Sequence, residues 1–496
     1  STGGKVSVSA EGGTLTMTGG NVTAAGDIAL SASGAATLNL LTALTRNGGV
    51  NITAANGLIN LFNSNINSAA DILVQSLAGA VTLNGSVFNS SNGSIRATAG
   101  NGNIQSHLLR YTAAQDIVLQ ANNGQLILGS GGGDTLSAAG NVALNASGAV
   151  NLNGTVLSST GESVSVTSGT GALSMTGGNV TAAKDISLSG NGVTTNGGLL
   201  NASGGVNIAA GTGALVLNNT VNAGNDIHLA AGGGGIRVDN GGSLVSASGN
   251  ITLDGTSGDS AAGVHLNGTA GSKVNISAVN GTITLNGTSA TGAGVLVTNA
   301  LVDAVRAAIH GQSTRGSYGF SLTDTTLGAN LASLQNVTLS SAGSGAGATN
   351  LLDNSVVNDT NRDSLLNKQI ENMTTVEMNG TAVFGNGTEA WEQKYQDQTN
   401  PNGGWIFNNA TVNAASADVS GVGFTNSTLT VNSGGLTIAN NGTVVLSDST
   451  VTASNGEVTL SSTAGGVNLT GTTITAKDDL TVLVQNGDAS MSNATL

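Results

Sequence analysis

The sequence predicts an all-β fold, a right-handed parallel β-helix with three short strands and about 22 residues in each coil. Two observations support this prediction. The stretches GGNVTAAGDIALSASG from Gly19 and GGNVTAAKDISLSGNG from Gly177 are nearly identical, so the chain contains internal repeats. In addition, pairs of aliphatic residues separated by one residue recur at a nearly constant interval, within the range of solenoid repeats.

These aliphatic pairs mark the first strand of each coil. Their alternation is that of a strand, in which successive side chains point to opposite faces. The pairs are Val6/Val8, Ile28/Leu30, Val50/Ile52, Ile72/Val74, Ile95/Ala97, Ile117/Leu119, Val142/Leu144, Val164/Val166, Ile186/Leu188, Val206/Ile208, Ile227/Leu229, Ile251/Leu253 and Val274/Ile276.

A second and a third segment complete most coils. The third segment is shorter and lies around residues such as Val22 and Val221. The second pairs follow a Gly or Asn turn and include Leu15/Met17, Leu38/Leu40, Val81/Leu83, Val150/Leu152, Leu215/Leu217, Val264/Leu266 and Ile283/Leu285. Each strand of a β-helix pairs with its counterpart one coil away, at about 4.8 Å, so equivalent aliphatic residues stack in columns inside the coil.

The composition agrees with such a narrow core. The 496 residues include 76 Gly, one Pro and no Cys, and 2% are aromatic and 8% charged. Gly and Asn allow the positive φ angles of the corners, whereas Pro would remove a donor from the ladder. The net charge of −14, without a Lys/Arg run, argues against nucleic acid as a partner. No apolar run is long enough for a membrane helix, so we expect no membrane insertion.

The residues between the paired aliphatics are expected to face solvent. Most are small or polar, and Leu73 and Val118 are the exceptions, which suggests a covering loop or a contact surface. The expected outward positions are Ser7, Ala29, Asn51, Leu73, Arg96, Val118, Ala143, Ser165, Ser187, Asn207, His228, Thr252 and Asn275.

The repeat is regular over residues 1–298 and again over 409–496, which we assign to shaft. Residues 299–342 form less regular coils, in which positions 301–309 have a spacing closer to that of a helix. We interpret residues 343–408 as an insertion or loop subdomain, with an amphipathic helix expected at 361–373. Insertions between regular coils are a common place for binding surfaces.

Aromatic residues concentrate in this insertion. Trp391, Tyr395 and Trp405 are therefore the candidate partner-binding residues, because flat amphipathic rings provide a large contact area at low entropic cost. The alternative is that the three rings cover a local apolar patch.

We found few groups suited to chemistry. The aspartates Asp27, Asp71, Asp116, Asp185 and Asp226 recur at one corner, as expected for residues that cap a turn before a strand. The stretch GSGGGDTLS from Gly129 half-matches a calcium-binding nonapeptide repeat with Asp134 as the ligand, but it occurs as a single copy. We expect no catalytic residues, no metal site and no cofactor.

Sequons for asparagine glycosylation are frequent, and the high content of Asn, Ser and Thr accounts for most of them. The candidate glycosylation sites are Asn21, Asn51, Asn84, Asn145, Asn179, Asn250, Asn267, Asn286, Asn336, Asn379, Asn409, Asn426, Asn441 and Asn468.

With its pitch, its Gly and Asn corners and units such as AAGDIALSASG and NGGVNITAANG, the chain resembles the filamentous haemagglutinin-like exoproteins of bacterial two-partner secretion. The resemblance covers nearly all of the chain except residues 343–408. It implies a shaft segment of a large exoprotein that an outer-membrane transporter exports to the cell surface or the medium. The family's NPNG-type secretion motif has one counterpart, Asn400 to Gly403, deep in the chain.

The resemblance therefore implies a non-enzymatic, secreted adhesin that attaches to a host-cell receptor or glycan, or to another bacterial surface protein. Two alternatives stay open at this point. The chain would otherwise be the shaft of a contact-dependent growth-inhibition toxin, or, less favoured, a β-helix enzyme that cleaves polysaccharides with stacked carboxylates. We also expect further coils to cover at least one end, because exposed strand edges promote aggregation.

Overall fold

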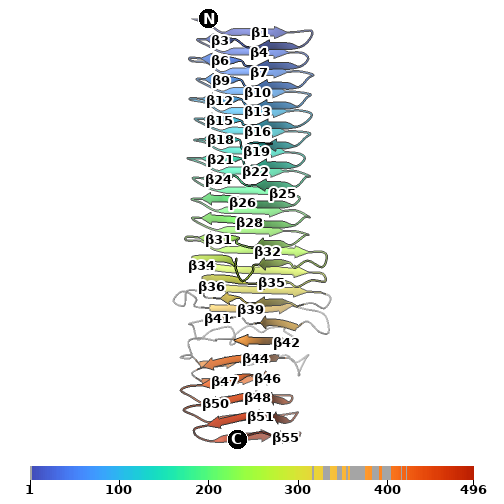
Figure 1. The fold of residues 1–496 in the computed structure, drawn as a ribbon, viewed down its shortest axis with the longest axis vertical. Coiled ribbons are helices and arrows are strands. Elements are labelled where there is room, and N and C mark those ends of the chain that lie inside the picture. The colour runs from blue at the N-terminus through green and yellow to red at the C-terminus, as the bar shows by residue number, and fades with distance from the viewer. Residues whose placement is uncertain are drawn as a thin grey trace. The chain divides into compact units, whose positions relative to one another are not determined.

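The computed structural model describes residues 3–314, 318–327, 336–342, 349–353, 356–357, 375–381, 390–393, 404–414, 416–420 and 422–496. Within these residues the chain is all-β, without a helix, and its strands stack in parallel as a β-solenoid (Figure 1). The predicted parallel β-helix is thereby confirmed. The chain forms two compact units, Ser1–Ala231 and Gly232–Leu496.

Unit 1 has three faces, each a ladder of parallel strands. The first face consists of β1 (Val6–Ala10), β4 (Ile28–Ala32), β7 (Val50–Ala54), β10 (Ile72–Ser76), β13 (Ile95–Ala99), β16 (Ile117–Ala121), β19 (Val142–Ala146), β22 (Val164–Ser168), β25 (Ile186–Gly190), β27 (Val206–Ala210) and β29 (Ile227–Ala231). The second face consists of β2 (Leu15–Thr18), β5 (Ala36–Asn39), β8 (Ile59–Phe62), β11 (Val81–Asn84), β14 (Ile104–His107), β17 (Leu126–Leu128), β20 (Val150–Asn153) and β23 (Leu173–Thr176). The third consists of β3 (Asn21–Ala24), β6 (Thr42–Thr45), β9 (Asn65–Ser68), β12 (Val87–Ser90), β15 (Arg110–Ala113), β18 (Thr135–Ala138), β21 (Val156–Ser159) and β24 (Asn179–Ala182). Two longer strands, β26 (Val193–Ala202) and β28 (Leu215–Ala223), continue both the second and the third face.

The same three-sided pattern holds within unit 2. Its first ladder contains β30 (Ile236–Asp239), β33 (Val264–Asn267), β35 (Val295–Thr298), β37 (Phe320–Thr323), β40 (Thr349–Asp353), β42 (Thr375–Thr381), β44 (Gly404–Ala414), β46 (Val422–Thr425), β49 (Val444–Ser447), β52 (Val467–Thr470) and β55 (Ala489–Ser492). The remaining strands are β31 (Ser243–Ser246), β32 (Ile251–Ser257), β34 (Val274–Ser289), β36 (Ala300–Ser313), β38 (Thr326–Leu327), β39 (Asn336–Ala342), β41 (Val356–Val357), β43 (Ala390–Gln393), β45 (Ser416–Ser420), β47 (Thr428–Val431), β48 (Leu436–Asn440), β50 (Thr450–Ala453), β51 (Val458–Ser462), β53 (Thr473–Ala476) and β54 (Leu480–Val484).

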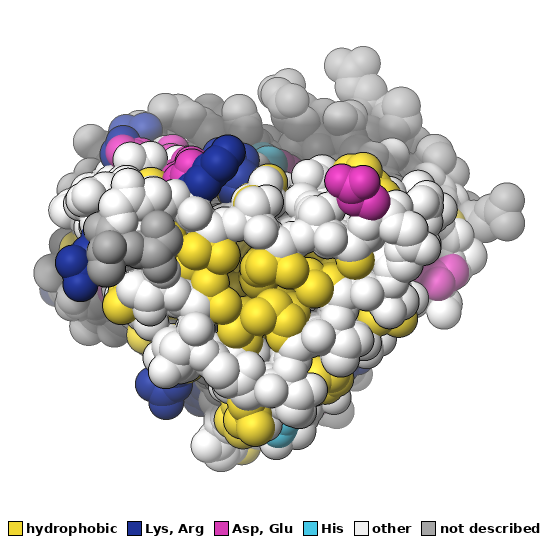
Figure 2. All heavy atoms as spheres, turned by 90° about the horizontal axis from the view of Figure 1, so that it is seen from above, with side chains coloured by type: hydrophobic (Ala, Val, Ile, Leu, Met, Phe, Trp, Pro, Cys, Tyr) yellow, Lys and Arg dark blue, Asp and Glu magenta, His cyan; other side chains and the backbone are white. Residues whose placement is uncertain are grey.

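The core is a set of in-register aliphatic columns. Ile117 pairs with Val142 and Leu119 pairs with Leu144, and these inward side chains are fully buried. The intervening residues predicted to face solvent are all exposed or half-buried, as expected, and Leu73 and Val118 are half-buried. Figure 2 views the molecule from above and shows apolar side chains gathered in the middle of that face, surrounded mainly by uncharged polar atoms. The stacked columns bury mainly aliphatic side chains, together with serine and threonine side chains and a few aromatic rings.

The duplicated stretches occupy equivalent positions in the coil. The strands β1, β2 and β3 read VSVSA, LTMT and NVTA, and β22, β23 and β24 read VSVTS, LSMT and NVTA. The repeats quoted from Gly19 and Gly177 therefore form the same part of two different coils.

The helix-like spacing at 301–309 was misleading. These residues belong to the strand β36, which pairs in parallel with β34 and has Val302 and Ile309 buried. A register shift between Ala278 and Thr282 in β34 lets both ends of β36 stay in the ladder. Pairing with the neighbouring coil therefore decides the conformation, against the local spacing.

Strands also lie inside residues 343–408, where β40, β42 and β44 pair in parallel. The boundaries proposed at residues 298, 342 and 408 stay a prediction. The helix expected at 361–373 lies outside the described residues.

The corner after the second face repeats a left-handed backbone conformation. Gly85, Gly154 and Gly177 have positive φ there, and each N–H continues the ladder to the next coil. Leu40 (φ 56°) and Leu108 (φ 53°) occupy the same corner and are more than half exposed. A left-handed conformation costs a residue with a Cβ about 1–2 kcal/mol.

Truncation of an inward side chain is expected to destabilise the fold strongly. Leu144 is fully buried between Leu119 and Val166, so Leu144→Ala should lower the free energy of unfolding by about 2–5 kcal/mol. Urea unfolding followed by circular dichroism measures this change. The control Ser165→Ala, at an outward position one coil away, should change it by less than about 0.5 kcal/mol. Equal unfolding midpoints for the two variants would contradict the role of the columns.

Replacement of a left-handed leucine by glycine is expected to stabilise the chain. Leu40→Gly removes the Cβ strain at an exposed corner and should raise the free energy of unfolding by about 1 kcal/mol. Leu77→Gly is the matched control, because Leu77 is equally exposed but is not among the residues with positive φ. This control should be destabilised by about 0.5–1 kcal/mol. The same direction of change in both variants would refute the strain at Leu40.

Candidate functional site

The coil of β16 to β18 in unit 1 is irregular, and it borders a groove. In successive coils of the second face, the residues at the fourth strand position are Asn84, His107, Gly129, Asn153 and Thr176. Gly129 is the one of these five that has no side chain. The strand β17 therefore ends at Leu128, and Gly129 has a φ of +75°. A Cβ at Gly129 would overlap the carbonyl oxygen of Asn153, so only glycine fits. The column of side chains is interrupted at this point.

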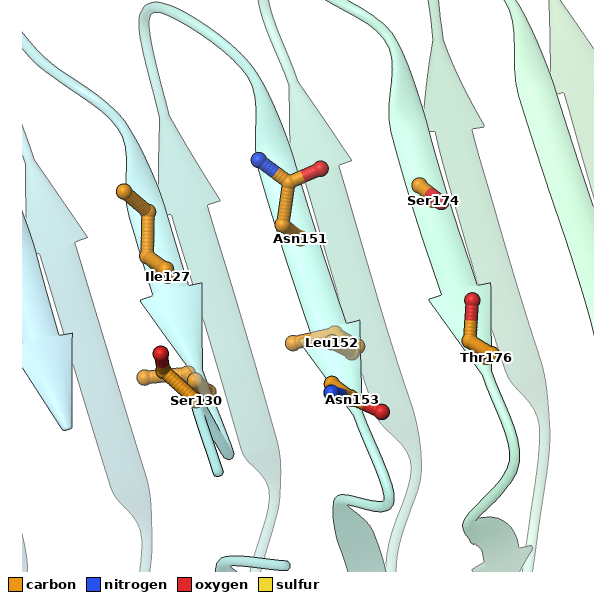
Figure 3. A pocket seen from close by; sticks show the side chains of 8 residues that line it. Ile127, Ser130, Asn151, Leu152, Asn153, Ser174 and Thr176 are labelled. Carbon is orange, nitrogen blue, oxygen red and sulfur yellow. The ribbon is translucent and has the colours of Figure 1, made fainter. Parts of the chain in front are cut away.

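We call the resulting hollow the Gly129 groove. It has a volume of about 290 Å³, is open to solvent, and is lined by Ile127, Leu128, Ser130, Asn151, Leu152, Asn153, Ser174 and Thr176. Figure 3 shows Ile127, Asn151 and Ser174 on three successive strands, and the strand register places these three residues side by side. Ser130, Asn153 and Thr176 lie near the ends of these strands (Figure 3). The lining carries no charged side chain.

The loop after Gly129 lies against the preceding coil. A Cβ on Gly132 would be 2.8 Å from Cδ2 of Leu108, and one on Gly131 would be 3.4 Å from Cε1 of His107. The glycines of this loop thus permit a close approach to these two side chains. The loop forms one wall of the groove through Ser130.

Asp134 anchors the far end of this loop from inside the coil. Its side chain is fully buried and accepts hydrogen bonds from the N–H of Leu109 and the N–H of Gly129, both at 2.7 Å, and from the hydroxyl of Ser106. All three partners are hydrogen-bond donors, as a buried carboxylate requires. The nonapeptide-like stretch from Gly129 therefore places Asp134 inside the coil, where its carboxylate anchors the loop.

Tyr111 lies in the same buried layer. Its ring meets that of Phe88 edge to face, with centroids 4.6 Å apart. Its hydroxyl is buried and has no hydrogen-bond partner. Burial, and then the negative charge of Asp134, raises the pKa of the Tyr111 phenol above its usual range.

Two other buried polar atoms without a partner adjoin this coil. They are Nδ1 of His107 and Oγ1 of Thr155, and a Cβ at Gly129 would lie 3.0 Å from the latter. In the part of the chain that the structure describes, His107, Tyr111 and Thr155 are the residues with such atoms. All three flank the loop from Gly129 to Asp134, so unsatisfied polarity is concentrated at this site.

The corner aspartates act as turn caps, as predicted. Each carboxylate accepts a backbone N–H from the following coil, and the pairs are Asp27 with Gly49, Asp71 with Ser94, Asp116 with Asn141 and Asp185 with Gly205, at 2.7–2.8 Å. Asp226 precedes β29 at the equivalent position. Neither these residues nor Asp134 form a pair of neighbouring carboxylates.

A smaller polar cluster lies on the outward side of unit 2. Arg237 and Asp239 form an ion pair at 2.6 Å, and Nδ2 of Asn267 donates to Asp239 at 2.8 Å. Burial opposes ionisation of Asp239, but the hydrogen bonds from Arg237 and Asn267 outweigh it and lower its pKa. Burial and the charge of Arg237 lower the pKa of His265, against the opposing effect of Asp239.

The candidate partner-binding aromatics are placed only in part. Trp391 lies in β43 opposite Ala417, and Trp405 lies in β44 opposite Val376 and Val422. Tyr395 lies outside the described residues. Whether the three rings form one surface stays a prediction.

The candidate glycosylation sites are at the surface wherever the structure describes their side chains. Asn21, Asn51, Asn179, Asn250, Asn426, Asn441 and Asn468 are exposed, and Asn84, Asn145, Asn267 and Asn286 are half-buried. Asn267 and Asn286 donate hydrogen bonds to Asp239 and Asp254. Asn336, Asn379 and Asn409 lie on strands whose side chains are not described.

In the described residues, no group of three or more His, Asp or Glu side chains is placed to hold a metal ion. Nor do these residues contain a helix of the length and apolarity that would cross a membrane. Comparison of the chain with protein families, with curated proteins and with solved structures found no match. The fold and the Gly129 groove thus define a β-solenoid with a lateral, uncharged groove.

Removal of the Tyr111 hydroxyl is expected to stabilise the chain and to change its response to alkali. Tyr111→Phe deletes a buried hydroxyl without a partner, which should raise the free energy of unfolding by up to about 1 kcal/mol. Folding raises the pKa of the Tyr111 phenol, so above the unfolded pKa of about 10 the unfolded chain loses this proton while the folded chain keeps it. The free energy of unfolding is therefore unaffected by this ionisation below that pH and falls as the pH rises above it.

Urea midpoints measured between pH 7 and pH 11 test both effects. Those of the parent chain should fall more steeply above pH 10 than those of Tyr111→Phe. Tyr318→Phe is the control, because the Tyr318 hydroxyl is not among the buried atoms without a partner. Parallel curves for the parent chain and Tyr111→Phe would show that Tyr111 is not shielded from solvent.

Proposed function

We propose that the chain is a shaft segment of a secreted bacterial adhesin, exported by an outer-membrane two-partner transporter, and that it attaches to host cells or to other bacteria. The observation that carries the proposal is the continuous parallel ladder of unit 1, from β1 to β29, with outward side chains that are short and mostly uncharged. Such a scaffold presents an extended lateral surface to a partner. The resemblance to filamentous haemagglutinin-like exoproteins supplies the expectation of export.

In this proposal the chain is not an enzyme. The carboxylates that an acid and base pair would need are already engaged in unit 1, where the corner aspartates accept backbone N–H groups and Asp134 accepts three donors. Their role in capping and anchoring accounts for their positions along the coil. A polysaccharide-cleaving activity would have to place two such groups on opposite sides of a scissile bond.

Adhesion is expected to depend on the aromatic residues of the 343–408 segment. Because strands of this segment pair into the ladder, point variants are preferable to a deletion. Beads coated with the purified chain are applied to epithelial cells and to bacterial lawns, and bound beads are counted. The triple variant Trp391→Ala, Tyr395→Ala and Trp405→Ala should reduce binding at least tenfold, as for the loss of interface hot spots.

The matched control removes three exposed leucines elsewhere, Leu40→Ala, Leu77→Ala and Leu483→Ala. This control should bind as the parent chain does. Binding that survives the aromatic variant would move the contact away from these rings while retaining adhesion. A parent chain that binds neither cell type would contradict the proposed function.

A further inference from the structure

We propose that the Gly129 groove binds a short stretch of an uncharged glycan. The inference deepens the proposed adhesin function and rests on it for its biological setting, although binding to the groove is measurable by itself. It assigns a specific contact to unit 1, separate from the aromatic residues of unit 2.

The groove offers hydrogen-bonding groups that nothing else uses. The side chains of Ser130, Asn151, Asn153, Ser174 and Thr176 line it and make no hydrogen bond to another group in the described part of the chain. Elsewhere, outward asparagines commonly pair across coils, as Asn286 does with Asp254 at 2.6 Å. Asparagine and serine or threonine groups both donate and accept, which matches the hydroxyl groups of a sugar.

The arrangement of these groups is periodic. Asn151 pairs in register with Ser174, and Asn153 with Thr176, so two rows of polar groups advance by one coil, about 4.8 Å, per step. Within the groove, Ile127 lies next to Asn151 in the first of these rows and provides an apolar surface there. Two such rows suit a ligand with hydroxyl groups along both edges and an apolar ring face.

Other ligand classes fit less well. A nucleic acid or an acidic polysaccharide requires cationic side chains, and the lining has none. A peptide that adds a strand requires an open edge, but β20 is paired with β17 on one side and with β23 on the other. A wholly apolar ligand would find little contact, since Leu128 and Leu152 are only 1% and 2% exposed.

The local structure retains costly features around the groove. The positive φ of Leu108, the buried polar atoms without partners in His107 and Thr155, and the buried Asp134 anchor all occur around this one loop. Elsewhere in unit 1 a non-glycine residue with positive φ occurs at Leu40 and Asn63, but within the described residues the buried polar atoms without a partner and the buried carboxylate occur only around this loop. Deviations of this kind from an otherwise consistent design concentrate at functional sites.

The test uses an array of neutral, sialylated and sulfated glycans, probed with the labelled full chain, and titration calorimetry with the best neutral oligosaccharide found. The double variant Asn151→Ala and Asn153→Ala should weaken binding at least tenfold, which corresponds to about 1.4 kcal/mol. The control Asn60→Ala lies in the same outward row as Asn151 but on β8, outside the groove, and should bind as the parent chain does. A second variant, Ser174→Tyr, fills the groove from an outward position and should abolish binding.

Urea midpoints of all variants confirm that they fold. Absence of any neutral glycan binder on the array overturns the inference, as does neutral-glycan binding that survives both Ser174→Tyr and the double variant. Cell adhesion without glycan binding would sink this inference and leave the adhesin function intact. Glycan binding through the groove without cell adhesion would support this inference and contradict the proposed adhesin function.

Discussion

The structure depends on one constraint, the in-register pairing of every strand with its counterpart one coil along the chain. Each inward position then faces the same position in both neighbouring coils, so the side chains of one column must fit together along its length. Val50, Ile72 and Ile95 follow one another in this way. The scarcity of aromatic residues and the abundance of glycine are consequences of this pairing, because the column is narrow and each corner requires a tight turn.

The Gly129 groove lies where one outward column of side chains, the fourth strand position of the second face, is interrupted by glycine. Gly129 carries no side chain at a position where the neighbouring coils have one, and the groove lies beside it. The loop that follows Gly129 needs an attachment to the coil. Asp134 supplies that attachment inside the coil, where three donors hold its carboxylate. A buried charge is stable only with such complete hydrogen bonding. The groove thus forms on the surface of unit 1 while the strand ladders continue in the coils before and after it.

The alternation and pitch of the sequence were sufficient to predict the strands, their order in the coil and the outward residues, because these depend only on neighbouring coils. The spacing at 301–309 is closer to that of a helix, yet these residues form β36, because pairing with β34 outweighs the local pattern. The groove could not be predicted from motifs, because it depends on a side chain that is absent. Alignment of the coils in register, with Gly129 below His107 and above Asn153, is the pattern that would have revealed it. Asp134 could be singled out from the sequence, but its burial could not, because the burial depends on the path of the loop.

The equivalence of the coil of β1 to β3 with that of β22 to β24 has a genetic consequence. Homologous recombination between the DNA encoding the two copies would excise the intervening coils as whole units and join β3 to the strand that normally follows β24. The new junction would place β1 against β25, whose inward Ile186 and Leu188 match Ile28 and Leu30 of β4. Length could therefore vary between lineages through a single crossover, with the hydrogen-bond ladder and the buried columns preserved at the seam, and with the Gly129 groove lost or retained as one cassette.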